Sequence, residues 1–518
     1  MTAHTQPKIG SYRFRILALV LFATTINYLD RSIIGVLAPT LQYKIFSWSD
    51  TDYANIMMAF KIGYALGLLM MGNLIDRYGT RIGYVASIIA WSIFGMLHAL
   101  IRPSFSVIGF IVGRFGFAVT QAGNYPSAAK TAAEWFPKKE RALAVGIFNI
   151  GACFGPILAP IVVALVVMVD GTNWQFAFLT TGIFSLLFVI LWLKYYRKPE
   201  EHPDLSPAEL EFINSDSAAE TDKKLPWRNL LPLKQTWAFS IAKISDAAWW
   251  FYLFWGGKFL FDKFGLNIKE LALPMILIYT IVIFGSIGGG WFSGYLIKSG
   301  ISINRARKST MLISAISILP VVFVTLLPTS FEVNDGLYKS LAASTIKVSK
   351  IEIVDGSKTT IREDMAFPPE IIETMKQLDG KTYNSARDLS IDMEALIGKE
   401  NLKKYEPLIH TNSRANQLYW MAILLIGLAA SGHAAWMANV YAMASDVFPK
   451  KAVASVAGIG GMIGAAAGML ADFGVGQVLT NSGTAGYFFA FLVASLLYLV
   501  LLGIIHLLMP NLNPLGDD

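Results

Sequence analysis

The chain has 518 residues, of which 54% are hydrophobic and only 15% are charged, and its formal net charge is +7. Its mean hydropathy is +0.50. Soluble domains need more polar surface than this, so the composition excludes an ordinary globular protein and predicts an all-α polytopic membrane protein. The positive charge fits membrane topology, and we expect the lipid bilayer and no nucleic acid among its partners.

Twelve apolar stretches of about 20 residues are long enough to cross a bilayer as helices. They begin near Arg13, Tyr53, Ile82, Phe105, Ala142, Trp174, Thr236, Leu271, Thr310, Gln417, Val453 and Tyr487. The opening "MTAHTQPKIGSYRFR" lacks the apolar core of a cleavable signal. The single cysteine, Cys153, rules out an intrachain disulfide.

Lysine and arginine gather in alternate loops, which sets the expected orientation. The basic loops carry Lys8, Arg13 and Arg15, then Arg77 and Arg81, then Lys138, Lys139 and Arg141, and finally Lys298, Arg305, Arg307 and Lys308. Because positive loops stay inside, we expect both termini to be cytoplasmic in a multi-pass membrane protein.

A hydrophilic linker divides the chain into two halves. Residues 196–235 form a Pro-rich cytoplasmic segment with one short surface helix at "SPAELEFI". Residues 1–195 are expected to form one six-helix bundle and residues 236–518 a second. We expect the protein to be a monomer.

A second hydrophilic segment, residues 331–414, interrupts the second half and is expected to face outward. The alternation in "IKVSKIEIVDGSKTTI" around Asp355 and Gly356 predicts a β-hairpin. The stretches "PPEIIETMKQL" and "ARDLSIDMEALIGKENLKKY" predict amphipathic helices. We therefore expect a small α/β insert, and docking to a periplasmic partner is one use for it.

The two halves contain a repeat. "AEWFPKKERALAVGIFN" begins at Ala133 and "SDVFPKKAVASVAGIGG" at Ser445, and each joins an acid to Phe-Pro-Lys-Lys and a small-residue helix. An internal repeat of this size predicts two pseudo-symmetric bundles with a central site at their interface.

Several motifs carry a family resemblance. "GNLIDRYGTR", residues 72–81, resembles the signature loop of the major facilitator superfamily. "NYLDR", "AGNYPSAAKTAAEWFPKKERALAVGIFN" and "GSIGGGWFSGYLIKSGISINRARK" are similar to the anion:cation symporter branch, in particular its hexuronate transporters. The resemblance covers nearly all of the membrane part and not the insert. It implies import of a sugar acid across a bacterial inner membrane by alternating access, with a proton as the coupling ion.

The signature loop has a readable physical role. Its conformational residues are Gly72, Asp76, Arg77, Gly79 and Arg81. Glycine permits a tight turn and a close approach of helices, and Asp76 can pair with a basic residue across the cytoplasmic face.

Charged side chains inside the first half predict an anion site. A charge at the bilayer centre costs about 2.5 to 3.5 kcal/mol, so such residues usually mark a substrate or ion pathway. Asn27, Asp30 and Arg31 are spaced i, i+3 and i+4, which predicts one shared helical face. Arginine can grip a carboxylate with two parallel hydrogen bonds. The alternative is that Asp30 only neutralises Arg31 or Arg114 and locks helices together.

Two further spans add candidates. Lys61 and Tyr64 lie three residues apart, and Arg114 and Gln121 lie seven apart, so each pair shares a face. Lys61 is a candidate for substrate binding, although it could instead snorkel to an interface.

The resemblance assigns roles to several of these residues. Arg31 corresponds to the arginine that holds the substrate carboxylate, and Asp30 to the acid linked to protonation. Arg114 corresponds to the partner of Asp30, and Tyr28 and Tyr64 to tyrosines of the pocket.

The chain departs from the family in its fourth span. "TQAGN" at residues 120–124 has Gln121 where relatives usually carry a titrating glutamate. Glutamine cannot gain or lose a proton at physiological pH. The open alternatives are that Asp30 carries the proton, that another group does so, or that the protein is an uncoupled facilitator. His433 stands at the position of the repeat equivalent to Gln121 and could titrate, but packing between helices explains it as well.

The second half offers aromatic and amide groups. "DAAWWFYLFWGGKFL" contains Trp249, Trp250, Tyr252 and Trp255, and aromatic planes suit the C–H faces of sugars. The hydroxyl partners are expected from Asn149, Trp436 and Asn439. A first half that grips carboxylate and a second that cradles a polyol would select a sugar acid, whether glucuronate, galacturonate or a related hexonate.

Other function classes find little support in the residues. The runs "GSIGGGWFSG" and "GIGGMIGAAAG" lack the Lys-Ser or Lys-Thr of a phosphate loop and fit close helix packing. We expect no metal site, no cofactor and no enzymatic activity. The rival from another class is a transporter-derived sensor that would use the insert at 331–414.

Overall fold

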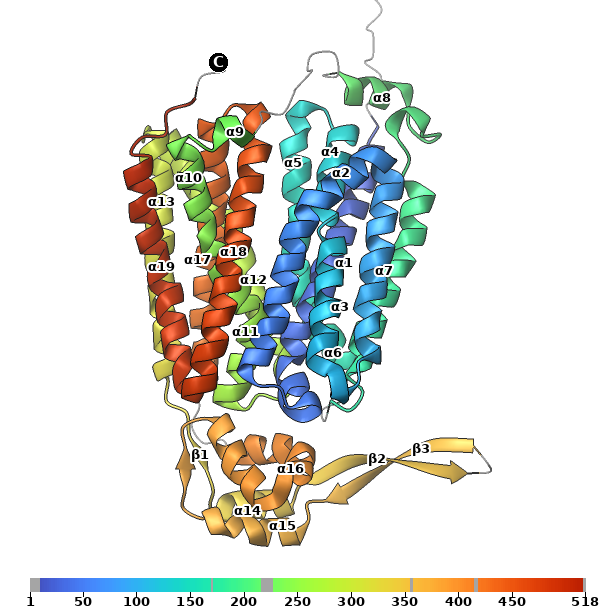
Figure 1. Ribbon diagram of the computed structural model, residues 1–518, viewed down its shortest axis with the longest axis vertical. Helices are drawn as coiled ribbons and strands as arrows, with labels where there is room; N and C mark the ends of the chain where they lie inside the picture. Colours follow the sequence, from blue (N-terminus) through green and yellow to red (C-terminus); the bar gives the residue numbers. More distant parts are fainter. Residues whose placement is uncertain (1–9, 169–170, 216–226, 355–356, 414–417, 516–518) are drawn as a thin grey trace, which may run out of the picture.

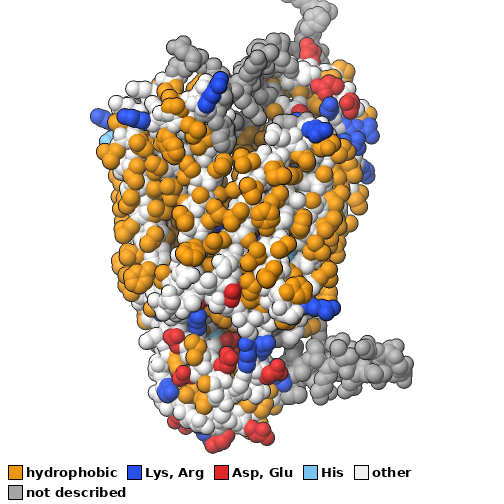
Figure 2. Space-filling view, viewed as in Figure 1, with side chains coloured by type: hydrophobic (Ala, Val, Ile, Leu, Met, Phe, Trp, Pro, Cys, Tyr) orange, Lys and Arg blue, Asp and Glu red, His pale blue; other side chains and the backbone are white. Residues whose placement is uncertain are grey.

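The computed structural model describes residues 10–168, 171–215, 227–354, 357–413 and 418–515. A bundle of long helices carries a small extra body beyond one end (Figure 1). We call this end the insert end, and the opposite end, where α8 (Pro207–Asn214) lies, the linker end. Hydrophobic side chains cover the side of the bundle, and charged side chains gather toward its two ends (Figure 2). This distribution is what a lipid-embedded bundle requires.

The described residues of the first half form seven α-helices. They are α1 (Tyr12–Pro39), α2 (Asp50–Leu97), α3 (Ser106–Gln121), α4 (Asn124–Trp135), α5 (Lys138–Asn149), α6 (Gly151–Val166) and α7 (Gln175–Tyr195). A π-helical turn, Thr40–Phe46, extends α1. Inside α2 the backbone leaves helical geometry at Gly79, where φ is 78°, so α2 contains two spans joined by a bend. Glycine adopts this positive φ without the steric cost of a Cβ atom.

The second half follows the short helix α9 (Trp227–Leu230). Its helices are α10 (Lys234–Ala242), α11 (Asp246–Phe264), α12 (Ala272–Lys298), α13 (Ile303–Ile318), α17 (Tyr419–Val447), α18 (Lys450–Ser482) and α19 (Gly486–Leu508). Helix α13 begins before the predicted Thr310 because the Ser302 side chain accepts a hydrogen bond from the Arg305 backbone. The loop placement predicted for Arg305, Arg307 and Lys308 was therefore wrong, since all three lie in α13.

Ten helical segments of the described chain are long and apolar enough to cross a membrane. One of them, Ser455–Leu508, contains most of α18 and all of α19 and so counts twice. The pair α10–α11 lies beside these segments in the bundle and has lower hydropathy because of its polar residues (Figure 1). With these additions, the described helices agree with the twelve predicted spans, and the all-α polytopic class is confirmed.

At its proline, the predicted repeat has a similar backbone conformation in both halves. Pro137 has φ −61° and ψ 156°, and Pro449 has φ −59° and ψ 148°. Each proline immediately precedes a helix, α5 or α18, where its fixed φ and missing N–H suit the start of the helix.

The segment between α13 and α17 has its own secondary structure and core. Its elements are β1 (Phe331–Glu332), α14 (Asp335–Ala342), β2 (Thr345–Val354), β3 (Ser357–Ala366), α15 (Pro369–Met375), β4 (Thr382–Tyr383) and α16 (Ala386–Ser413). Strands β1 and β4 pair antiparallel, as do β2 and β3. A separate hydrophobic cluster, which includes Phe331, Leu389 and Ile409, holds the helices together. The predicted turn at Asp355 and Gly356 lies outside the described residues.

The signature loop forms the bend of α2 at the linker end. Arg81 Nη2 donates a hydrogen bond to the Leu193 carbonyl over 2.8 Å, and Trp192 Nε1 donates to the Arg81 carbonyl over 3.2 Å. These bonds tie the bend to α7. Arg77 lies beside the ring of Tyr78, 5.7 Å from its centroid.

Two other residues of this loop bear on the prediction. A Cβ atom added to Gly72 would meet open space, so close packing does not require glycine there. The side chain of Asp76 lies outside the described residues, and its pairing across the face stays a prediction.

Candidate functional site

Arg31 lies between the two halves inside a cage of aromatic rings. Its guanidinium carbon is 4.5 Å from the ring centroid of Tyr28 and 4.6 Å from that of Tyr64. Trp250 of α11 approaches from the second half, with its centroid 5.5 Å away. Among the residues that the structure describes, no carboxylate forms an ion pair with Arg31. The site therefore holds a buried positive charge that ring faces stabilise but do not neutralise.

Gln121 fixes the position of this guanidinium. Arg31 Nε donates to Gln121 Oε1 over 3.0 Å, and Gln121 Nε2 donates to the Asn27 carbonyl over 2.8 Å. Asn27 Nδ2 in turn donates a hydrogen bond to the Gln121 backbone carbonyl over 3.2 Å. Both ends of the glutamine amide are thus used. A glutamate here would have placed a negative charge against Arg31, whereas glutamine orients the cation and leaves its charge uncompensated.

Asp30 points away from Arg31 into the first half. Its Oδ2 accepts a hydrogen bond from Ser185 of α7 over 2.7 Å, and its Oδ1 has no partner among the described atoms. The prediction that Asn27, Asp30 and Arg31 share one face was therefore wrong for Asp30. Consecutive helical residues are about 100° apart, so Asp30 and Arg31 cannot face the same way.

Arg114 shares a small internal cavity with Asp30. The cavity is also lined by His98, and it lies among α1, α2, α3 and α7. The Arg114 guanidinium lies 4.6 Å from the ring centroid of Phe60, and its Nε and Nη2 have no partner among the described atoms. Asp30 and Arg114 thus occupy one pocket, as the resemblance implied, but this pocket is separate from the cage around Arg31.

Lys61 of the first half forms an ion pair with α18 of the second half. Its Nζ lies 2.6 Å from Asp472 Oδ2 of α18 and donates to the Gly468 carbonyl over 2.8 Å. Asp472 also accepts a hydrogen bond from Trp255 Nε1 over 3.1 Å. Lys61, a predicted substrate-binding residue, is thus paired with an acid of the other half, and its role in binding stays a prediction. Sequence reasoning missed Asp472, although a lone acid in the apolar stretch "GMLADFGVG" was a usable signal.

Four predicted residues of the second half are buried in its interior. His433 Nδ1 lies 2.8 Å from the Tyr498 hydroxyl, and the His433 ring stacks on Trp249. The other three, Tyr252, Trp436 and Asn439, contact the Phe491 ring, the Tyr498 ring and the Gly289 carbonyl, respectively. None of these contacts reaches Arg31. Of the aromatic cluster in α11, Trp250 supplies the contact to the cage.

A second polar group lies toward the linker end and spans both halves. Lys243 Nζ is 2.6 Å from Asp246 Oδ2 and donates to the Tyr441 hydroxyl over 3.2 Å. Tyr125 of the first half lies close to Asn149, Tyr441 and Lys243. Tyr125 and Tyr441 are 48% and 49% exposed. Sequence reasoning named Asn149 but missed the charged pair in "AKISDAAWW", where the same rule for intramembrane charges applies.

The halves meet tightly at the insert end. Lys258 Nζ of α11 lies 2.9 Å from Asp50 of α2, and both side chains are fully buried. Tyr53 donates to the Phe254 carbonyl over 2.7 Å. Among the described residues, no group of three His, Cys, Asp or Glu side chains could hold a metal ion. The geometry is that of a cationic central site closed off on its insert side.

Comparison with known proteins gives consistent findings. The sequence profile of the Major Facilitator Superfamily matches residues 20–341. The chain is 33% identical over 289 residues to the galacturonate transporter of Dickeya chrysanthemi, an alignment that covers 55% of this chain and 82% of that protein. It is 29% identical over 315 residues to the hexuronate transporter of Escherichia coli (strain K12), covering 60% and 72%.

A similar fold occurs among solved structures. The structure of a bacterial homolog of the human lysosomal transporter Spinster, in an inward-facing and unoccupied conformation, superposes with a TM-score of 0.63 at 16% identity. The match covers 96% of this chain and 98% of that one.

Proposed function

Because the chain belongs to the Major Facilitator Superfamily, whose members are membrane transporters and not enzymes, we propose that it imports a monovalent sugar acid. The substrate class is a hexuronate, such as glucuronate or galacturonate, or a related hexonate. The observation that carries this proposal is the uncompensated Arg31 in its aromatic cage between the halves. The names of the galacturonate and hexuronate transporters to which the chain is similar support the same class.

The cage suits such a ligand chemically. A carboxylate would accept two hydrogen bonds from the Arg31 fork and supply the missing negative charge. The rings of Tyr28, Tyr64 and Trp250 offer planes for the C–H face of a sugar. Hydroxyl groups would find donors and acceptors at Tyr125 and Asn149 of the first half and at Tyr441 of the second.

The transport cycle is alternating access of the two halves around this site. From the basic loops we infer that both termini are cytoplasmic and that the insert lies outside the inner membrane. In that orientation, the Lys258–Asp50 contact closes the outer side of the carrier. Outward opening must separate this pair, together with Lys61 and Asp472, because both pairs join the halves.

Proton symport is the proposed energetics, and uncoupled facilitation is the alternative that Gln121 favours. Gln121 uses its amide for Arg31 and Asn27 and cannot titrate. Asp30 keeps one carboxylate oxygen without a partner among the described atoms, so it has an acceptor free for a proton.

The test is uptake of radiolabelled glucuronate and galacturonate into proteoliposomes, with and without an inward proton gradient. Accumulation that requires the gradient supports symport, and its loss in Asp30→Asn would assign the proton to Asp30. Equilibration without accumulation makes the protein a facilitator. Absence of uptake for both acids and for related hexonates contradicts the proposed substrate class.

A further inference from the structure

The insert reaches across the molecule to the first half. It is joined in sequence to the second half, yet its Glu406 lies 3.3 Å from Lys44 Nζ. Lys399 of α16 donates a hydrogen bond to the Ser47 hydroxyl. Arg387 Nη1 lies 2.9 Å from Asp50 Oδ2. The insert is thus docked over the point where the two halves close.

A cavity of about 190 Å³ lies between the insert and the carrier. The residues that define its chemistry are Tyr43, Arg387, Ser390, Lys399, Lys403 and Glu406. The volume is below the roughly 300 to 1,000 Å³ of pockets for drug-sized ligands, which fits a ligand of monosaccharide size.

The charges around this cavity leave a positive excess. Lys44 is paired with Glu406, and Arg387 with Asp50, so these residues are compensated. In the described part of the chain, neither Lys399 nor Lys403 forms an ion pair, and both line the cavity. The one other acid in the lining, Glu394, is exposed to solvent. Lys399 and Lys403 therefore give the cavity an excess of positive charge, and the solvent-exposed carboxylate of Glu394 offsets only part of it.

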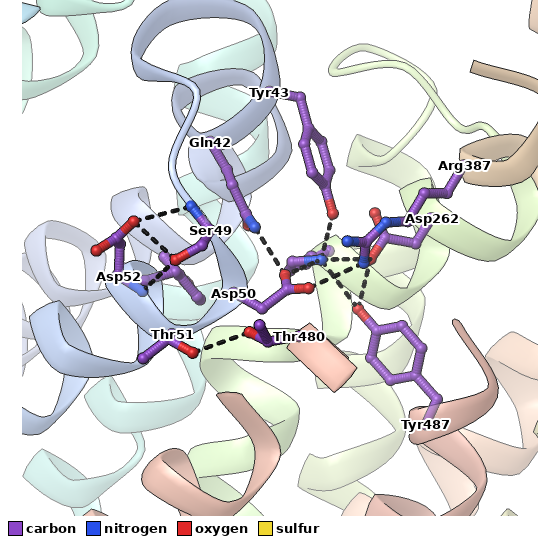
Figure 3. A network of polar contacts seen from close by, with 12 residues as sticks. Gln42, Tyr43, Ser49, Asp50, Thr51, Asp52, Asp262, Arg387, Thr480 and Tyr487 are labelled. Carbon is purple, nitrogen blue, oxygen red and sulfur yellow. Dashed lines mark hydrogen bonds and ion pairs between the residues drawn. The ribbon is translucent and has the colours of Figure 1, made fainter. Parts of the chain in front are cut away.

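Two residues that line the cavity also belong to the polar contact that closes the two halves at the insert end. Tyr43 and Arg387 line the cavity and belong to the network of Figure 3. In that network Asp50 pairs with Lys258, Asp262 pairs with Lys258, and the Tyr487 hydroxyl donates to Asp262 over 2.8 Å. An anion in the cavity would stand beside Arg387 and could compete with Asp50 for its guanidinium.

From this arrangement we infer that the insert and the carrier form an anion-binding vestibule, which receives the carboxylate of the transported sugar acid before the outer side opens. Lys399 and Lys403 bind the carboxylate. The hydroxyls of Ser390 and Tyr43, which are hydrogen-bonded to Glu406 and Lys258, respectively, line the same cavity. The inference rests on the proposed function for the identity of the ligand and on the cavity for its site. It gives the insert a role in capture, distinct from the central binding step at Arg31.

The test is protection of lysines from a membrane-impermeant acetylating reagent, applied from outside to spheroplasts that express the full chain. Galacturonate at about ten times its dissociation constant should slow acetylation of Lys399 and Lys403 about tenfold, as mass action requires. Lys376 is the matched control, because it is half exposed on the same insert and pairs with Glu373 away from the cavity. Neutral galactose should protect none of these lysines. Protection should persist in Arg31→Ala, where the central site is broken.

The outcomes separate this inference from the proposed function. Uptake of sugar acid without protection of Lys399 and Lys403 would overturn the vestibule and leave the proposed function standing. Equal protection by galactose, or equal protection of Lys376, would overturn it as well. Protection without uptake of any sugar acid would contradict the proposed function and retain the vestibule. A Lys399→Gln/Lys403→Gln variant should raise the KM for uptake and leave kcat unchanged, whereas Lys376→Gln should change neither.

Discussion

Two buried clusters of charge in this protein differ in how their cations are balanced. At the insert end, Lys258 and Arg387 face Asp50 and Asp262, so two positive charges meet two negative ones. At the centre, Arg31 meets rings and amides and no carboxylate among the described residues. The difference separates a contact that holds the halves together from a site that awaits an anion. Charge alone within a span does not distinguish the two.

The largest expected effect comes from breaking the balanced cluster. Lys258→Ala leaves Asp50 and Asp262 buried with only Arg387, and removing one partner of a buried ion pair typically costs about 3 to 5 kcal/mol. We expect a marked fall in the thermal unfolding temperature of the purified protein. Lys269→Ala, an exposed lysine just beyond the same helix, is the control and should have no such effect. Equal unfolding temperatures for the two variants would show that the cluster does not stabilise the closed end.

Removing Arg31, the central cation without a carboxylate partner among the described residues, should instead reduce transport and leave the unfolding temperature unchanged. Arg31→Ala loses charge-assisted hydrogen bonds to the substrate worth about 1.5 to 3 kcal/mol, which corresponds to a fall of about tenfold to more than a hundredfold in kcat/KM. Arg31→Lys keeps the charge but not the planar fork and should fall between wild type and alanine. Uptake kinetics measure both, with the exposed Arg102→Ala as control. Full uptake by Arg31→Ala would reject the central site.

Gln121→Glu would place a negative charge next to Arg31 and so neutralise the positive charge of the central site. A carboxylate at this position would accept the hydrogen bond from Arg31 Nε and compete with the substrate carboxylate for the guanidinium. We therefore expect the KM for galacturonate to rise about tenfold at neutral pH. Because the new group can titrate, uptake should become stimulated by acid, whereas wild type should lack that response from this position. A pH profile of uptake for both proteins checks this. Identical profiles would mean that the charge next to Arg31 does not govern binding.

The smallest expected effect concerns the docking of the insert. Burial alone would raise the pKa of Glu406, but the charges of Lys44 and His410 and a hydrogen bond from Ser390 hold the pKa below its ordinary value of 4.5. A lowered pKa means that the stabilisation is complete above that ordinary value and is lost as the pH falls through the lower, folded value. We expect docking to be constant down to about pH 5 and to weaken below it.

Limited proteolysis of the insert as a function of pH measures this docking. Glu406→Gln should be cut faster at neutral pH and should show a flatter pH dependence. Loosening of the wild-type insert between pH 7 and about pH 5 would contradict the assignment to a carboxyl with a lowered pKa.

The sequence predicted the spans, the two halves and the buried cations because each of these follows from the composition of a short segment. Hydropathy located the spans, the Phe-Pro-Lys-Lys repeat identified two halves, and the intramembrane charge rule selected Arg31 as a site residue. The placement of Lys61 and of Asp30 could not be predicted in the same way. Lys61 is paired with Asp472 from a distant helix, and Asp30 turns to Ser185 of α7. Helical spacing tells which residues share a face but not which helix covers that face.

By itself, the sequence determined the class of the protein, the course of its spans and the presence of buried cations, since these follow from apolar length and from the cost of charge in lipid. Only the tertiary structure decided which of the buried cations in the described residues have a carboxylate partner. Lys61 and Lys258 are neutralised by acids that the packing of distant helices brings to them, and Arg387 arrives from the insert. Arg31 meets aromatic rings and a glutamine instead, because those are the side chains that α2, α3 and α11 present to its face. The balance of buried charge is a property of neighbours in space, and this balance separates the binding residue from the structural ones.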